Sequence, residues 1–253
     1  TESRLLKFEN TVFSIPSPYQ LAILVKKSGI EYNNEILNKT EHYSNYTGNF
    51  KKALNLGVYG ADLSYLNIYE QVPEAINYFS VIKQLAEDLD LTGTFDQETI
   101  SRIENNMGKK DSLLFILSNL YRSADAYLKN NNRQEIGALV LAGGWVEGLN
   151  LLLKTAEETE NPAMLNRIGE QKQPLENLLK LLQPYYSESP EYQKLIDDLV
   201  DLAYEFDGIE KNYTYKEPEI DVENHLIKIN STSDVIITED HLNIIKQKAE
   251  AIR

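Results

Sequence analysis

Two acidic residues could carry chemistry, because each lies within an otherwise apolar segment with helical periodicity. Glu147 falls in the segment 136–153, on the same helical face as glycine and leucine residues. Asp62 has a comparable place in the segment 49–71. A carboxylate buried alone loses several kcal/mol of hydration free energy, so we expect each acid to be paired, protonated or next to a wet cavity.

These acids admit a structural and a functional interpretation. In the structural one, they pair with an arginine such as Arg102, Arg122 or Arg133, or with a tyrosine hydroxyl. In the functional one, the helices 49–71 and 133–158 enclose a pocket lined by the acids and by aromatic residues. The candidate ligand-binding residues are Tyr59, Asp62, Tyr65, Trp145 and Glu147. Two acids close together would also suit a carboxylate-based hydrolase, although we assign no catalytic residue.

The histidines form no recognisable catalytic or metal-binding pattern. They are His42, His225 and His241, and none follows a glutamate by three residues, which excludes the Glu-x-x-His pairs of di-iron bundles. The chain also lacks a His-Glu-x-x-His zinc pattern, a Gly-x-Ser-x-Gly nucleophile elbow and a glycine-rich nucleotide loop. We therefore favour a protein without a cofactor or metal, and one that is not an enzyme.

The segment 88–99 comes close to the pattern of a calcium-binding loop, with acids at early ligand positions and Gly93 at the sharp turn. Position twelve of that pattern is Thr99 instead of the bidentate glutamate. We therefore expect an ordinary turn between two helices, with Thr94 capping the second one, and no useful calcium affinity.

The composition is that of an ordinary globular protein. The chain has 253 residues, 42% of them hydrophobic, which suffices for one large core or two small ones. Its 25 basic and 39 acidic residues give a net charge of -14, which disfavours nucleic acid and anionic lipid surfaces as partners. The absence of cysteine excludes disulfides and thiol chemistry. No segment approaches the ~20 apolar residues needed to span a bilayer.

Helical periodicity dominates from Pro18 to about Asn212 and predicts an all-α fold, either a multi-helix bundle or a helical-repeat array. Residues 1–17 are expected to form an extended lead-in, because residues that precede proline avoid the helical region. The helical domain then covers 18–212. Its predicted helices are 18–28, 49–71, 73–90, 96–107, 111–130, 133–158, 161–183 and 190–211.

The C-terminal segment 213–253 has a different pattern, which predicts a β-hairpin followed by a helix over 239–252. Strand is expected only within about 222–237, with a turn at 231–234.

A weak internal repeat relates the segments 49–90 and 133–178, and it suggests a duplicated helical unit. Both central helices of this repeat contain glycines, at Gly57 and Gly143 among others, and each glycine costs about 1 kcal/mol in a helix. Either the two helices approach each other closely, or the glycines leave room for a ligand beside the backbone.

Several segments within about 12–158 resemble a family of uncharacterised Bacteroidetes proteins, usually described as hypothetical proteins or lipoproteins. The resemblance rests on Ile15-Pro-Ser-Pro-Tyr19, Lys52-Ala-Leu-Asn-Leu-Gly-Val-Tyr-Gly-Ala-Asp62, Lys110-Asp-Ser112 and Gly143-Gly-Trp-Val-Glu-Gly148. It implies a mature chain tethered outside the cytoplasm by an N-terminal lipid, whose cysteine is absent from this sequence. It implies no activity and no functional residue.

These observations favour a non-enzymatic binding or scaffolding module at the cell envelope. The first alternative is a small-ligand receptor or sensor domain with its pocket between the helices 49–71 and 133–158, and the second is the hydrolase. The expected partners are proteins or small molecules at the envelope, without nucleic acid. The expected location is the periplasm, with membrane contact only through the N-terminal lipid anchor.

Overall fold

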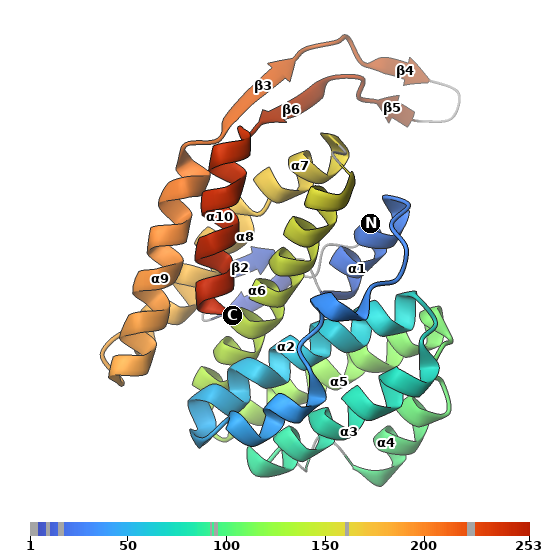
Figure 1. Cartoon of the computed structure of the whole chain (residues 1–253), viewed down its shortest axis with the longest axis vertical. Coiled ribbons are helices and arrows are strands. Elements are labelled where there is room, and N and C mark those ends of the chain that lie inside the picture. The colour runs from blue at the N-terminus through green and yellow to red at the C-terminus, as the bar shows by residue number, and fades with distance from the viewer. Residues whose placement is uncertain are drawn as a thin grey trace.

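The computed structural model describes residues 5–8, 11–14, 18–91, 93, 96–159, 162–221 and 226–253. Packed helices form the body of the molecule, and a ribbon of strands projects from it (Figure 1). Helices account for most of the described residues, which confirms the all-α class. The α-helices are α1 (Pro18–Lys27), α2 (Gly48–Ile68), α3 (Val72–Asp88), α4 (Gln97–Glu104), α5 (Lys110–Asn130), α6 (Gln134–Thr159), α7 (Pro162–Gly169), α8 (Lys172–Leu182), α9 (Pro190–Asp207) and α10 (Glu239–Ile252).

The predicted helix 161–183 is broken into α7 and α8 by a turn at Glu170 and Gln171, which corrects that prediction. The cap of α4 also differs from the expected one, because the side chain of Asp96, rather than Thr94, accepts a hydrogen bond from the Thr99 amide. Three short 3-10 helices, for which we expected no separate element, are η1 (Asn34–Ile36), η2 (Thr40–Asn45) and η3 (Gln183–Tyr185).

Helices α2 and α6 cross at the centre of the body with their backbones in contact (Figure 1). A Cβ atom on Gly57 would overlap the Val140 carbonyl oxygen and lie 2.6 Å from the Gly144 nitrogen. A Cβ atom on Gly143 would overlap the Leu54 carbonyl group. These glycines therefore serve close helix packing, which confirms the first of the two interpretations, and they leave no room for a ligand at this crossing.

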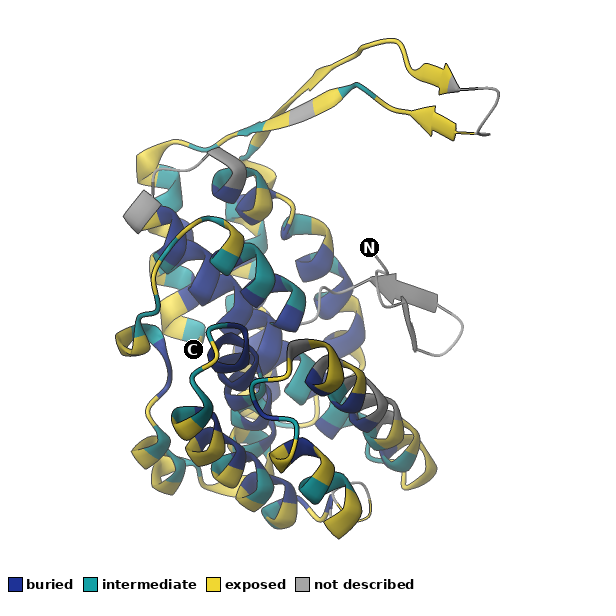
Figure 2. Cartoon of the chain, turned by 90° about the vertical axis from the view of Figure 1, so that its right-hand side faces the viewer, coloured by how far each residue is buried: buried dark blue, intermediate teal, exposed yellow. Residues whose placement is uncertain are grey.

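Helix α6 forms the core of the body, because most of its described residues are buried, and buried residues fill the centre of the molecule in Figure 2. Contrary to our expectation, its segment Gln134–Glu157 is long and apolar enough to cross a membrane. However, 83% of its apolar 18-residue stretch is buried inside the fold. Neighbouring helices thus already cover the surface that lipid would contact, which explains the apolar composition without a membrane.

The strands form two-stranded antiparallel ribbons, and their positions correct the prediction. β1 (Leu5–Phe8) pairs with β2 (Thr11–Ser14) within the expected lead-in. β3 (Glu210–Thr214) pairs with β6 (Thr232–Ile236), and β4 (Glu219–Asp221) pairs with β5 (Leu226–Lys228). Strand thus extends well beyond 222–237, and the predicted turn at 231–234 lies largely in β6. The described part of the chain runs outward through β3 and β4 and returns through β5 and β6.

We call this long ribbon, residues 210–236, the arm. Its base is fixed to α7, where the Val235 amide donates to Asn166 Oδ1 at 2.7 Å and the Val235 side chain packs against Gly169. Beyond the base, the arm extends away from the helices into solvent (Figures 1 and 2). Every residue from Glu210 to Ile220 is exposed.

Helix α10 follows the arm directly and packs on α6 and α9. Its own buried residues are only Ile245 and Ala249. Several ion pairs supplement this small apolar contact, and they are Lys154–Glu250, Lys246–Glu157, Lys248–Asp201, Lys248–Glu205 and His241–Glu205. Helix α10 therefore belongs to the body, where it follows the arm and covers parts of α6 and α9.

Candidate functional site

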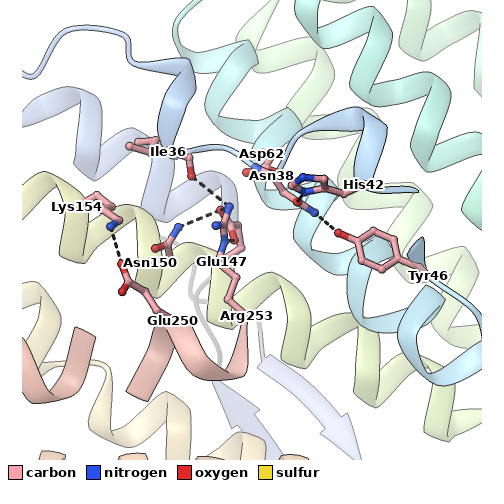
Figure 3. Close-up of polar contacts among 10 residues, drawn as sticks. All are labelled: Ile36, Asn38, His42, Tyr46, Asp62, Glu147, Asn150, Lys154, Glu250 and Arg253. Atoms are coloured by element: carbon pink, nitrogen blue, oxygen red, sulfur yellow. Dashed lines mark hydrogen bonds and ion pairs between the residues drawn. The ribbon is translucent and has the colours of Figure 1, made fainter. Parts of the chain in front are cut away.

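Asp62 of α2 and Glu147 of α6 lie side by side where the two helices cross (Figure 3). Both residues are 0% exposed. The glycine contacts bring the two backbones together, and this proximity places the acids within interaction distance of each other. The sequence correctly predicted their burial and their shared seam, whereas their partners differ from the expected ones.

Arg253, which follows α10, provides the positive charge for this acid pair. Its Nε and Nη2 atoms donate to the two carboxylate oxygens of Glu147, the latter over 3.1 Å, and Nη2 also donates to the Ile36 carbonyl at 3.2 Å (Figure 3). Such a bidentate contact is among the strongest hydrogen-bonded ion pairs in proteins. Asn150 adds a further donor to Glu147 at 3.2 Å. The Glu147 carboxylate is therefore saturated by the protein itself.

Asp62 has fewer partners. Its Oδ2 atom accepts a hydrogen bond from the Asn38 amide at 3.2 Å, while Oδ1 is buried without a donor. Burial and the adjacent Glu147 charge raise the pKa of Asp62 well above its usual range. The burial of Asp62 beside the Glu147 charge therefore favours its neutral, protonated form.

The segment between α1 and α2 covers the acid pair. The Asn38 side chain donates to the Tyr46 hydroxyl at 2.9 Å, and its oxygen lies 2.9 Å from His42 Nδ1 (Figure 3). This network orients the Asn38 amide toward Asp62. The acids are therefore enclosed by α2 and α6, by this segment, and by Arg253.

The other predicted ligand residues hold the structure together. The Tyr59 hydroxyl donates to the Lys39 carbonyl at 2.9 Å, and the Tyr65 hydroxyl accepts from the Asn33 amide at 3.1 Å. Both tyrosines thus attach the segment preceding α2 to that helix. Trp145, in contrast, is directed to the junction of α7 and α8, where its indole nitrogen lies 3.3 Å from Gln171 Oε1. The structure therefore does not gather the five residues around one pocket.

Glu147 pairs with an arginine, as the structural interpretation expects, but this arginine was not among those named from the sequence. Arg253 binds Glu147, whereas Arg102 is exposed and Arg133 lies elsewhere on the body. The side chain of Arg122 lies outside the described residues. A sequence signal for Arg253 was lacking, because the pairing joins positions 106 residues apart and no local spacing reveals such a contact.

The acid pair is poorly suited to bind a metal or a substrate as it stands. Among the described residues, no group of three or more histidine and acidic side chains is arranged to hold a metal ion.

In the segment 88–99, which comes close to the pattern of a calcium-binding loop, Asp88 pairs with Lys52 at 2.7 Å and Asp96 caps α4. Thr92, Thr94 and Phe95 lie outside the described residues.

The arm is the second candidate site, because it exposes large apolar side chains. Isolated exposed apolar residues are common on protein surfaces, but a cluster marks an interaction site. Those with at least 60% exposure on the arm are Tyr213, Tyr215, Ile220, Leu226, Ile227 and Ile229. Across the rest of the described chain, only Phe115 and Tyr204 reach this level.

Comparisons with protein-family models, with curated proteins and with solved structures find no match to this chain.

Proposed function

We propose that this chain is a non-enzymatic protein-binding module whose binding element is the arm. The observation that carries the proposal is the contrast between the two candidate sites. The acid pair is closed and satisfied from within the chain, whereas the arm exposes a cluster of apolar side chains that the body leaves uncovered. The helical body would then serve as a rigid base that presents the arm.

This contrast makes the receptor and hydrolase alternatives less suitable. A receptor pocket between α2 and α6 would need space where the glycines bring the backbones into contact. A carboxylate hydrolase would need at least one acid accessible to water and substrate, but both are fully buried. Either function would require α10 to leave, since Arg253 occupies the position at the carboxylate of Glu147.

The cell-envelope location belongs to the same proposal. We infer it from the segments within about 12–158 that resemble a family of uncharacterised Bacteroidetes proteins, usually described as hypothetical proteins or lipoproteins. Fractionation of the native protein with the membranes tests this location.

Photo-cross-linking tests the binding role of the arm. A photoreactive amino acid replaces Ile227 on the arm in one variant and Ile76 in another, since Ile76 is an exposed isoleucine on α3 of the body. On illumination in the native cells, we expect the photoreactive residue at position 227 to form a covalent cross-link to another protein chain. The photoreactive residue at position 76 should give no specific cross-link. A lipid adduct at position 227, or equal products from both positions, would count against the arm as a protein-binding element.

A further inference from the structure

The distal part of the arm has one apolar face, whereas its other face carries charged side chains together with Leu226, which is paired with Asp221. The sequence Glu217-Pro218-Glu219-Ile220-Asp221 alternates acidic and non-polar residues. In the observed register Ile220 faces Ile227, while Glu219 faces Lys228 and forms an ion pair with it at 3.2 Å. Successive side chains of a strand point to opposite sides, so the isoleucine pair and the ion pair lie on opposite faces.

This pattern is typical of a sheet that has one buried face. In this ribbon the apolar face is not buried, because Ile220, Ile227 and Ile229 are 66%, 67% and 76% exposed. A two-stranded ribbon is marginally stable in water without a covering layer. The distal arm also lies away from the helices, so the body does not supply that layer (Figure 1). Another molecule has to provide it.

We propose that the covering layer is the same face of a second copy, so that two arms pack apolar face to apolar face. This inference rests on the proposed function of the arm and names its partner. Two-fold symmetry brings identical patches together, and a patch must then be self-complementary. The isoleucines meet this condition because they carry no charge, whereas an acidic or basic patch would repel its own copy.

The distribution of charge favours this contact over others between two copies. Each chain carries a net charge of -14, so contact through the acidic body would bring like charges together. In the arm-to-arm arrangement, Glu219, Asp221 and Lys228 stay on the outer faces, and Lys228 offsets part of the acidic charge through its ion pair with Glu219. Stacked sheets lie about 10 Å apart, which is comparable to the screening length at physiological salt. Salt therefore screens the charges on the outer face of one arm from those on the outer face of the other.

The size of the contact predicts a reversible dimer. A few isoleucines from each copy bury less surface than the ~1,200–2,000 Å² typical of stable complexes, so the association belongs to the weak, transient class. Salt should strengthen it, because added ions screen the repulsion between two acidic chains and leave apolar burial intact. A basic partner protein would show the opposite dependence on salt.

Sedimentation of the purified chain tests the proposal. We expect the mass to rise from 29.0 kDa toward twice that value with concentration, and more so in high salt. The double substitution Ile220→Ser with Ile227→Ser should weaken the dimer by about tenfold or more, while Ile76→Ser should leave it unchanged. All three residues are exposed, so circular dichroism should report an intact fold in each variant.

Disulfide trapping gives an independent readout, because the natural sequence contains no cysteine. The substitution Ile227→Cys should yield a disulfide-linked dimer on mild oxidation, whereas Tyr204→Cys on α9, which is 68% exposed, should remain monomeric. A chain that stays monomeric at every concentration and salt level, or equal trapping of both variants, would overturn the second-copy proposal. Protein cross-links to other chains at position 227 would then still support the arm as a binding element, and their absence would remove both proposals.

Discussion

The guanidinium group of Arg253 contacts both carboxylate oxygens of Glu147, although 106 positions separate the two residues in the chain. Glu147 is fully buried, whereas the Arg253 side chain is 27% exposed, so the arginine closes the site from the outside. One ion pair thus connects the end of helix α10 to the centre of the α2–α6 crossing.

Removal of this arginine should destabilise the protein strongly. In Arg253→Ala the Glu147 carboxylate remains buried without its counter-ion, and breaking such a pair costs about 3–5 kcal/mol. Urea unfolding measures the loss, and Arg253→Lys should retain part of the stability because it keeps the charge but not the bidentate contact. Arg102→Ala is the control, since exposed substitutions change stability by about 0.5 kcal/mol or less. A loss for Arg253→Ala as small as that of the control would contradict the assignment.

Glu147→Gln separates the structural role of the acid pair from a ligand-binding role. The substitution weakens a buried charge-assisted hydrogen bond, so we expect a loss of roughly 1–3 kcal/mol in the free energy of unfolding. Thermal denaturation of the variant and the parent provides the comparison. An unchanged or higher melting temperature would instead favour the receptor or hydrolase alternative, because functional sites often sacrifice stability.

Asp62→Asn should alter how stability depends on pH. The pKa of Asp62 is raised in the folded state, so protons bind there more tightly than in the unfolded chain. The stabilising contribution is therefore complete below the ordinary aspartate pKa of about 3.9 and is lost as pH rises through the raised folded value. Asparagine imitates the neutral acid and lacks this loss. We expect the melting temperature of Asp62→Asn to increase relative to that of the parent as pH rises, whereas parallel pH profiles would contradict a raised pKa of Asp62.

The α2–α6 contact predicts opposite effects for two glycine substitutions. Gly57→Ala places a methyl group against the Val140 carbonyl, where backbone rather than a flexible side chain must move, so we expect a loss of about 3 kcal/mol or more. Gly137 also belongs to α6, but it lies next to α5 and not at the crossing. The nearest atom to a new Cβ there is the Leu128 Cδ1 at 3.4 Å. Gly137→Ala should therefore be neutral or stabilising by up to about 1 kcal/mol. Chemical denaturation measures both, and equal effects would show that the crossing is looser than described.

Helix α10 should depend more on its apolar contact than on any single ion pair. Ile245 is fully buried, and its truncation to alanine should cost about 2–4 kcal/mol. The partly exposed pair of Lys246 with Glu157 should contribute at most about 1 kcal/mol. Hydrogen exchange of the α10 amides should therefore accelerate much more in Ile245→Ala than in Lys246→Ala. The reverse order would indicate a helix held mainly by charge.

The helices could be predicted from the sequence because their signals are local. Ser189 and Pro190 mark the start of α9, and Thr238 caps α10 with its side chain, as the capping pattern suggests. The burial of Asp62 and Glu147 followed from the apolar residues around them on each helix. Local periodicity sufficed for these features.

The remaining features depend on contacts that local patterns do not reveal. The pairing of Arg253 with Glu147 joins residues 106 positions apart. The outgoing strand β3 was missed because Glu210, Lys211 and Asn212 have low strand propensity, and only the pairing with β6 makes this segment part of a ribbon. The proposed duplication of 49–90 and 133–178 stays a prediction.

The attachment of the arm also has a mechanical consequence. Its two strands leave the body side by side, one from the end of α9 and the other into the start of α10, and these two helices pack together. A force applied along the arm therefore pulls α10 lengthwise, over a helix of 14 residues and about 21 Å, against its neighbours. Arg253 lies at the far end of this helix, where Glu147 anchors it. Tension would load the contacts of α10 together in shear rather than peel them apart one at a time, so the body can bear a load that the isolated ribbon could not.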